Sequence, residues 1–168
     1  GRKINETIAA HTEPMSELEK KFKAFAIARA ENLAPDLDWE KPDIDPRRAN
    51  VDELIASHPK NYWILTQQAK RLLQQKQYEA AKAPLRKLIK AYPKNVESAD
   101  NPYALLAMAH RGLEEGEEER KVLETLSALS PDSLGAYLRL MEIGSEKEDW
   151  KSVETNGERY LAVNPLLP

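Results

Sequence analysis

Residues 62–93 read YWILTQQAKRLLQQKQYEAAKAPLRKLIKAYP, and this segment carries the clearest structural pattern of the chain. Apolar side chains recur every three or four residues in each half, which is the spacing of one helix face. The positions that share a face are Leu65, Ala69 and Leu72 in the first half and Tyr78, Ala81, Leu85 and Leu88 in the second. Pro93 follows, where its ring prevents a helix from continuing. The segment therefore predicts two short amphipathic helices back to back.

A ladder of prolines repeats this unit along the chain. Pro59, Pro93, Pro131 and Pro165 are spaced 34, 38 and 34 residues apart. A period in this range is typical of a stacked-repeat array, because one helix pair cannot bury its own apolar face without neighbours. The four additional residues of the second interval predict a longer connection around Val96–Asn101.

The second and third units carry apolar stripes of the same kind. Those of the second unit are Tyr103, Leu106, Ala107 and His110, followed by Leu123 and Leu126. Those of the third are Tyr137, Leu140, Met141 and Gly144, followed by Trp150, Val153 and Tyr160. We expect Leu85, Leu106 and Leu123 to be buried.

These stripes resemble the tetratricopeptide repeat family, whose repeat of about 34 residues carries W-x2-L-G-x2-Y, then A-x3-F and a proline. The resemblance implies an all-α fold, a right-handed superhelix of antiparallel helix pairs (a TPR-like α-α solenoid). Three positions depart from the family pattern. Gln68 replaces an apolar residue, Glu119 replaces a small residue, and Gly157 stands where a large ring is expected and could break the last helix.

The chain is predicted to hold an N-terminal region and an array. Residues 1–46 form a helix and an acidic, proline-rich linker, and residues 47–168 form the array, with a half repeat at 47–59 and repeats at 60–93, 94–131 and 132–165. Helices are expected over 13–33, 47–57, 61–75, 78–91, 101–113, 117–129, 133–144 and 148–162. Residues 2–11 show little pattern.

The N-terminal region carries two further signals. Leu18, Phe22 and Phe25 recur at helical spacing and predict a face that needs to be covered. The segment 34–46 contains three prolines and five acidic residues. A calcium loop of the EF-hand type would need a glycine that this segment lacks, so a linker is the favoured interpretation. Trp39 is expected to anchor the linker against a helix.

Composition and charge exclude several classes of function. The chain has no Cys, which excludes disulfides and thiolate metal sites, and no apolar run approaches the roughly 20 residues of a membrane helix. Residues 47–95 hold 11 basic and 3 acidic residues, a net charge of +8, whereas residues 96–168 hold 7 basic and 15 acidic residues, a net charge of −8. This split indicates solvated helix faces of opposite sign or a surface that steers a charged partner. Because few aromatic residues accompany the cations, no nucleic-acid partner is expected.

No constellation of residues predicts catalysis, a metal site or a cofactor. His11, His58 and His110 are far apart and lack metal-ligand spacing. His110 lies on an apolar stripe and is expected to be a packed core residue. No glycine-rich phosphate loop or nucleophile elbow occurs.

The resemblance implies that the first helices of the repeats line a concave groove that holds an extended peptide or a helix. The candidate groove residues are Trp63, Thr66, Gln67, Lys70, Leu105, Met108 and Arg139. Apolar anchors beside two cations suit an acidic-hydrophobic peptide. A subset of the family grips a carboxyl terminus with Lys, Asn and Arg. This chain has Leu105 where the Asn is needed, which argues against that mode.

Two alternatives to a peptide-binding module stay open. The charge split and an open C-terminal face favour self-association or a structural spacer. The segment Leu18–Trp39 also resembles the tail of a gluzincin-type metallopeptidase domain, which implies an ancillary region of a bacterial metallopeptidase. The chain begins with Gly1 rather than Met, which favours a segment excised from a larger protein.

Overall fold

The computed structural model describes residues 4–33, 38–42, 51–98 and 100–164. It divides into two units, Gly1–Leu37 and Asp38–Pro168, and we describe each by itself. The predicted helix residues 47–50 and most of the acidic segment 34–46 lie outside the described residues.

The first unit contains two helices, α1 (Ile4–His11) and α2 (Met15–Leu33). Helix α1 is not predicted by the sequence, because its eight residues are too few for a clear periodicity. Thr12 ends it by donating from its backbone N–H and its hydroxyl to the carbonyl of Ile8. On α2, Phe22 and Phe25 are 69% and 60% exposed, so within the first unit no described residue covers this face.

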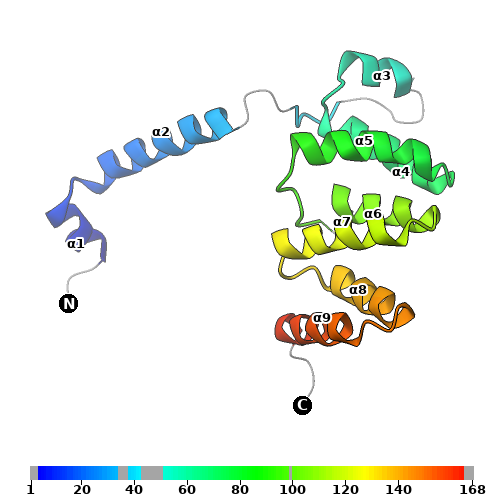
Figure 1. Ribbon diagram of the computed structural model, residues 1–168. Coiled ribbons are helices and arrows are strands. Elements are labelled where there is room, and N and C mark those ends of the chain that lie inside the picture. The colour runs from blue at the N-terminus through cyan, green and yellow to red at the C-terminus, as the bar shows by residue number, and fades with distance from the viewer. Residues whose placement is uncertain (1–3, 34–37, 43–50, 99, 165–168) are drawn as a thin grey trace. The chain divides into compact units, whose positions relative to one another are not determined.

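The second unit is a stack of helix pairs, shown from α4 down to α9 in Figure 1. We call α4, α6 and α8 the first helices and α5, α7 and α9 the second helices. Each helix from α4 onward packs against the next. The bounds are α3 Val51–Ser57, α4 Tyr62–Gln74, α5 Tyr78–Ala91, α6 Pro102–Gly112, α7 Gly116–Leu129, α8 Leu134–Glu146 and α9 Trp150–Val163. The predicted all-α architecture is confirmed for the described residues.

The six helices of the pairs begin and end within two residues of the predicted positions. The longer connection also lies where the proline spacing places it, since residues 92–101 join α5 to α6 whereas residues 130–133 join α7 to α8. Gly157 does not break α9, which runs through it without interruption. An added Cβ atom at this position would lie 3.5 Å from the sulfur of Met141, an ordinary van der Waals contact, so the packing of α9 here does not require a glycine.

Most of the predicted stripes lie in the core, whereas Trp150 of the third unit is 63% exposed and Val153 and Tyr160 are only partly buried. Leu85 is 0% exposed, and Leu106 and Leu123 are each 5% exposed, so all three are buried as predicted. Buried side chains from α6, α7 and α8 meet in one cluster that includes Ala107, Leu123 and Leu140. Burying these faces between neighbours stabilises helices that are each too short to be stable alone.

The turns between the two helices of a pair share an unusual backbone. Lys76, Glu114 and Glu148 have φ angles of 58°, 59° and 57°, in the left-handed region. They lie 38 and 34 residues apart, which is the proline spacing, so each pair closes through the same turn. An L-residue in this conformation is strained because its Cβ atom approaches the following carbonyl oxygen.

Replacing Lys76 with glycine is therefore expected to raise the free energy of unfolding by about 0.5–1 kcal/mol, since relief of the strain exceeds the added flexibility of the unfolded chain. Urea denaturation measures this difference. The matched control is Lys87→Gly inside α5, which is expected to lower stability by about 1 kcal/mol. A loss of stability in Lys76→Gly would contradict the proposed strain.

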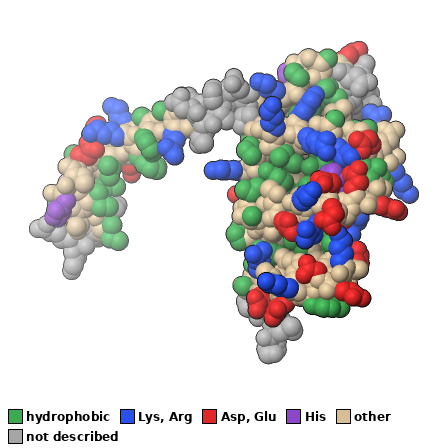
Figure 2. All heavy atoms as spheres, viewed as in Figure 1, with side chains coloured by type: hydrophobic (Ala, Val, Ile, Leu, Met, Phe, Trp, Pro, Cys, Tyr) green, Lys and Arg blue, Asp and Glu red, His purple; other side chains and the backbone are tan. Residues whose placement is uncertain are grey.

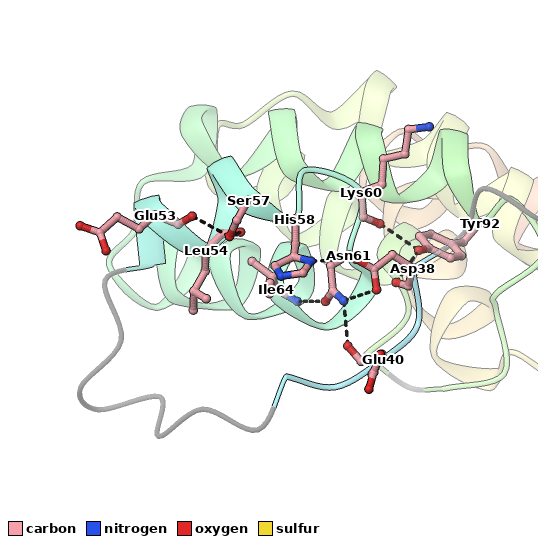
Figure 3. Close-up of polar contacts among 10 residues, drawn as sticks. All are labelled: Asp38, Glu40, Glu53, Leu54, Ser57, His58, Lys60, Asn61, Ile64 and Tyr92. Atoms are coloured by element: carbon pink, nitrogen blue, oxygen red, sulfur yellow. Dashed lines mark hydrogen bonds and ion pairs between the residues drawn. The ribbon is translucent and has the colours of Figure 1, made fainter.

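The N-terminal edge of the array holds a short extended segment, residues 38–42 (Figure 3). The buried side chain of Asn61 accepts a hydrogen bond from the backbone N–H of Ile64, which caps α4, and donates to Asp38 Oδ1 at 2.7 Å and to the carbonyl of Glu40 at 2.8 Å. The hydroxyl of Tyr92 lies 2.9 Å from the carbonyl oxygen of Asp38. Residues 38–42 therefore pack as part of the array rather than as the predicted linker.

Trp39 anchors this segment, as predicted. Its ring stacks on Tyr62 of α4 with centroids 5.0 Å apart, and it meets Tyr92 edge-on at 4.4 Å. The three aromatic rings fix the segment against the first helix pair.

Candidate functional site

A cavity of about 420 Å³ opens between the first helices α6 and α8, and we call it the α6–α8 cavity. Its floor is formed by Leu123 and Leu126 of α7 and by Ala107 of α6. Small residues on both walls, among them Ala104 and Gly135, leave the space open. A cavity with an apolar floor between two helices can accept an apolar side chain.

The rim of the α6–α8 cavity combines an apolar residue with charges of both signs. Met108 lines it and is 53% exposed. Arg111 and Arg139 contribute cations, and Glu97 and Asp132 contribute carboxylates. An exposed, flexible methionine at such a rim can adapt to different side chains.

Both arginines are held by a buried carboxylate. Glu119 of α7 is 1% exposed and receives hydrogen bonds from Arg111 Nε at 2.7 Å and from Arg139 Nε and Nη2 at 2.8 and 2.9 Å. Burial by itself raises the pKa of Glu119, but the hydrogen bonds from Arg139 and Arg111 outweigh it and hold the pKa below its ordinary value. This network joins α6, α7 and α8 beneath the rim, and its cations are largely neutralised.

The structure places the predicted groove residues in different environments. Met108 and Arg139 line the α6–α8 cavity, whereas the other five do not. Thr66 and Leu105 are 8% and 5% exposed and belong to the packing between helices. Gln67 is exposed.

The remaining two predicted residues are engaged by neighbouring segments. The ammonium of Lys41 lies 5.8 Å above the ring of Trp63, which is half-buried. The ammonium of Lys70 lies 2.6 Å from a carboxylate oxygen of Asp100. The cations predicted to guide an acidic peptide, Lys70 and Arg139, are thus both paired.

Sequence reasoning did not select Arg111, although a signal for it exists. Glu119 occupies a position where the resembled family has a small, buried residue. A carboxylate at a buried position requires cationic partners on neighbouring helices. Arg111 and Arg139 are on the two helices that flank α7, so the departure at Glu119 points to both.

A second polar network lies between α5 and α6. His110 is 3% exposed, as predicted for a core residue, and its Nδ1 lies 2.6 Å from Glu115. Glu115 also forms an ion pair with the ammonium of Lys82, which forms a second ion pair with Glu79. Hydrogen bonds from His110 and then Lys82 lower the pKa of Glu115. Because every member of this network is engaged by another, its role is structural.

Neither a metal site nor a membrane span is visible in the part of the chain that the structure describes. No group of three or more His, Asp or Glu residues there could hold a metal ion. No described helix is both long and apolar enough to cross a bilayer.

The stacked pairs with a shared turn define a tetratricopeptide-like array, a right-handed superhelix of helix pairs. Two solved structures of MamA have a similar fold: the MamA RS-1 ArsTM double mutant, with a TM-score of 0.60 and 21% identity, and MamA 41-end from Desulfovibrio magneticus RS-1, with 0.56 and 22%. The first alignment covers 68% of this chain and the second 69%, and each covers 62% of the MamA chain. At identities this low, the similarity is evidence for a shared fold only.

No family model and no curated protein matches the chain. The resemblance of Leu18–Trp39 to a metallopeptidase tail is therefore unsupported.

Proposed function

We propose that the array is a non-catalytic protein–protein interaction module that binds a peptide segment of a partner across its first helices. The observation that carries this proposal is the α6–α8 cavity with the exposed Met108 at its rim. Leu138, also on a first helix, is 45% exposed and adds a second apolar position. Exposed apolar side chains beside a preformed cavity favour a partner that inserts an apolar residue.

The charges at this face favour a different peptide from the one that the sequence predicts. Arg139 is committed to Glu119 and to Glu142, whereas Glu142 and Glu146 keep side chains that are 62% and 64% exposed. With Glu97 also on the cavity wall, the accessible charge is mainly negative. The proposed ligand is a segment with one apolar anchor and a flanking basic residue.

Selection from a displayed peptide library against the array tests this proposal. The selected peptides are expected to carry the apolar–basic pattern, and Met108→Glu is expected to weaken their binding about tenfold or more, because a carboxylate then occupies the apolar rim. The matched control is Leu129→Glu on α7, since Leu129 is 41% exposed and does not line the cavity. Unchanged binding by Met108→Glu would exclude the α6–α8 cavity as the site.

Self-association is the second candidate function, and helix α9 favours it. Asn156 is the one described residue of α9 that is buried, while Trp150 and Leu161 are 63% and 55% exposed. Exposed apolar side chains on one helix face favour contact with a second copy. Sedimentation of the wild type and of Trp150→Ser/Leu161→Ser distinguishes the candidates. Self-association predicts that the wild type sediments as a dimer and that the double variant sediments as a monomer.

A further inference from the structure

The exposed side of α5 carries cations that have no acidic partner among the described residues. Arg86, Lys87 and Lys90 are exposed and follow one another at helical spacing, and Lys94 lies just beyond the helix end. No carboxylate oxygen of a described residue lies within 4.0 Å of any of these four cations. Unpaired cations on one helix face produce a local positive potential.

The neighbouring second helix α7 differs in this respect. Its Arg120 pairs with Glu117 and Glu124, and its Lys121 pairs with Glu118 at 2.7 Å. In Figure 2, Lys and Arg side chains gather over α5, and acidic side chains become frequent over α7 and α9. Among the second helices, α5 therefore carries the largest group of neighbouring cations that form no ion pair with a described residue.

A shallow, open apolar depression with a volume of about 290 Å³ lies beside these cations, between α5 and α7, and we call it the α5–α7 cavity. Its walls include Ile89, Leu106 and Val122. Arg86 and Lys90 stand on one rim and Lys121 on the other. It lies on the second helices, and none of these residues lines the α6–α8 cavity.

We propose that the α5–α7 cavity is a second docking site, which binds an acidic peptide segment carrying one apolar side chain. The apolar side chain enters between Ile89 and Val122, and carboxylates on either side meet Arg86 and Lys90. From position 86 to position 90 the helix rises about 6 Å, which is the length of about two residues of an extended chain. The cations can therefore meet acids that flank a central apolar residue.

Two other anionic partners fit this surface less well. Insertion into a membrane needs protruding apolar side chains, whereas Leu106 is 5% exposed and Ile89 and Val122 are only partly exposed. Binding of single-stranded nucleic acid uses exposed rings for base stacking, whereas the ring at this cavity, Tyr103, is 6% exposed. The recessed walls and unpaired cations favour the peptide.

Fluorescence anisotropy with a labelled peptide, Asp-Asp-Leu-Asp-Asp between Gly-Ser spacers, tests the proposal at low ionic strength. Arg86→Glu/Lys90→Glu is expected to weaken binding about tenfold, because two attractions become repulsions. The matched control is Lys151→Glu/Arg159→Glu, which reverses two exposed cations of α9 and changes the net charge equally. This control is expected to change the affinity less than about twofold. Circular dichroism verifies that both variants fold.

A peptide with alanine in place of the central leucine is expected to bind about fivefold more weakly, because it leaves the apolar walls uncovered. The proposal would be overturned if the charge-reversal variants of α5 and α9 lowered the affinity for the peptide equally. It would also be overturned if the leucine and alanine peptides bound with equal affinity. Binding of phosphatidylserine vesicles or single-stranded DNA, but not of the peptide, would also overturn it. Met108→Glu is expected to leave this binding unchanged, so the result is independent of the α6–α8 cavity.

Discussion

Replacing Leu106 with alanine is expected to lower the free energy of unfolding by about 2–5 kcal/mol. Leu106 is 5% exposed, and the loss of its side chain leaves a void beneath α6 that close-packed neighbours fill only in part. Urea denaturation followed by circular dichroism at 222 nm measures the difference.

The control for this prediction is Leu129→Ala, the same substitution at a leucine that is 41% exposed. Its expected cost is about 0.5–1 kcal/mol, since less apolar area leaves water when the chain folds. Equal losses in the two variants would mean that the helix faces are assigned incorrectly.

Replacing Glu119 with alanine is expected to destabilise the array by about 3 kcal/mol, although it restores the small residue typical of the resembled family. The substitution leaves Arg139, whose side chain is 17% exposed, without its closest carboxylate, and it removes the link between α6 and α8. Thermal and urea unfolding both measure the loss.

The control is Glu124→Ala on the same helix, whose carboxylate is 53% exposed and whose removal is expected to cost less than about 1 kcal/mol. If Glu119→Ala is as stable as the wild type or more stable, the free energy lost by burying the carboxylate exceeds the free energy gained from its hydrogen bonds with the two arginines.

The same carboxylate predicts a dependence of stability on pH. The pKa of Glu119 is lower in the folded protein than the ordinary value of 4.5, so its contribution is complete above that value and is lost as the pH falls through the folded pKa. The difference in free energy of unfolding between wild type and Glu119→Gln is therefore expected to shrink as the pH is lowered below about 4.5. If this difference in free energy stays constant from pH 7 to pH 3, the ion pairs of Glu119 with Arg111 and Arg139 do not stabilise the folded protein.

The array could be predicted from sequence because its signals are local and repeated. Apolar spacing and the proline after each pair locate the helices, and equivalent units confirm one another. A helix of only eight residues is too short to show a clear periodicity, which is why α1 is missed. Gly157 misleads as a helix breaker because a glycine inside a helix costs only about 1 kcal/mol, which the packing of α9 against α8 offsets.

The details of the candidate site depend on contacts between residues far apart in sequence. Lys70 meets Asp100 thirty residues later, and Arg139 meets Glu119 on another helix. A spacing rule identifies which side chains share a face, but it does not show which cations are already paired. The docking of Asp38 onto Asn61 is missed for the same reason, since an acidic, proline-rich segment carries no periodicity.

Methyl NMR tests the proposed peptide-binding face most directly, because the chain has three methionines in distinct places. Met15 lies on α2, Met108 at the rim of the α6–α8 cavity, and Met141 beside α9. When a library-selected peptide is added to protein labelled at its methionine methyl groups, the signal of Met108 is expected to shift with the bound fraction, while those of Met15 and Met141 stay in place. Saturating peptide that shifts Met141 or Met15 and leaves Met108 unchanged would contradict the assignment of the binding face.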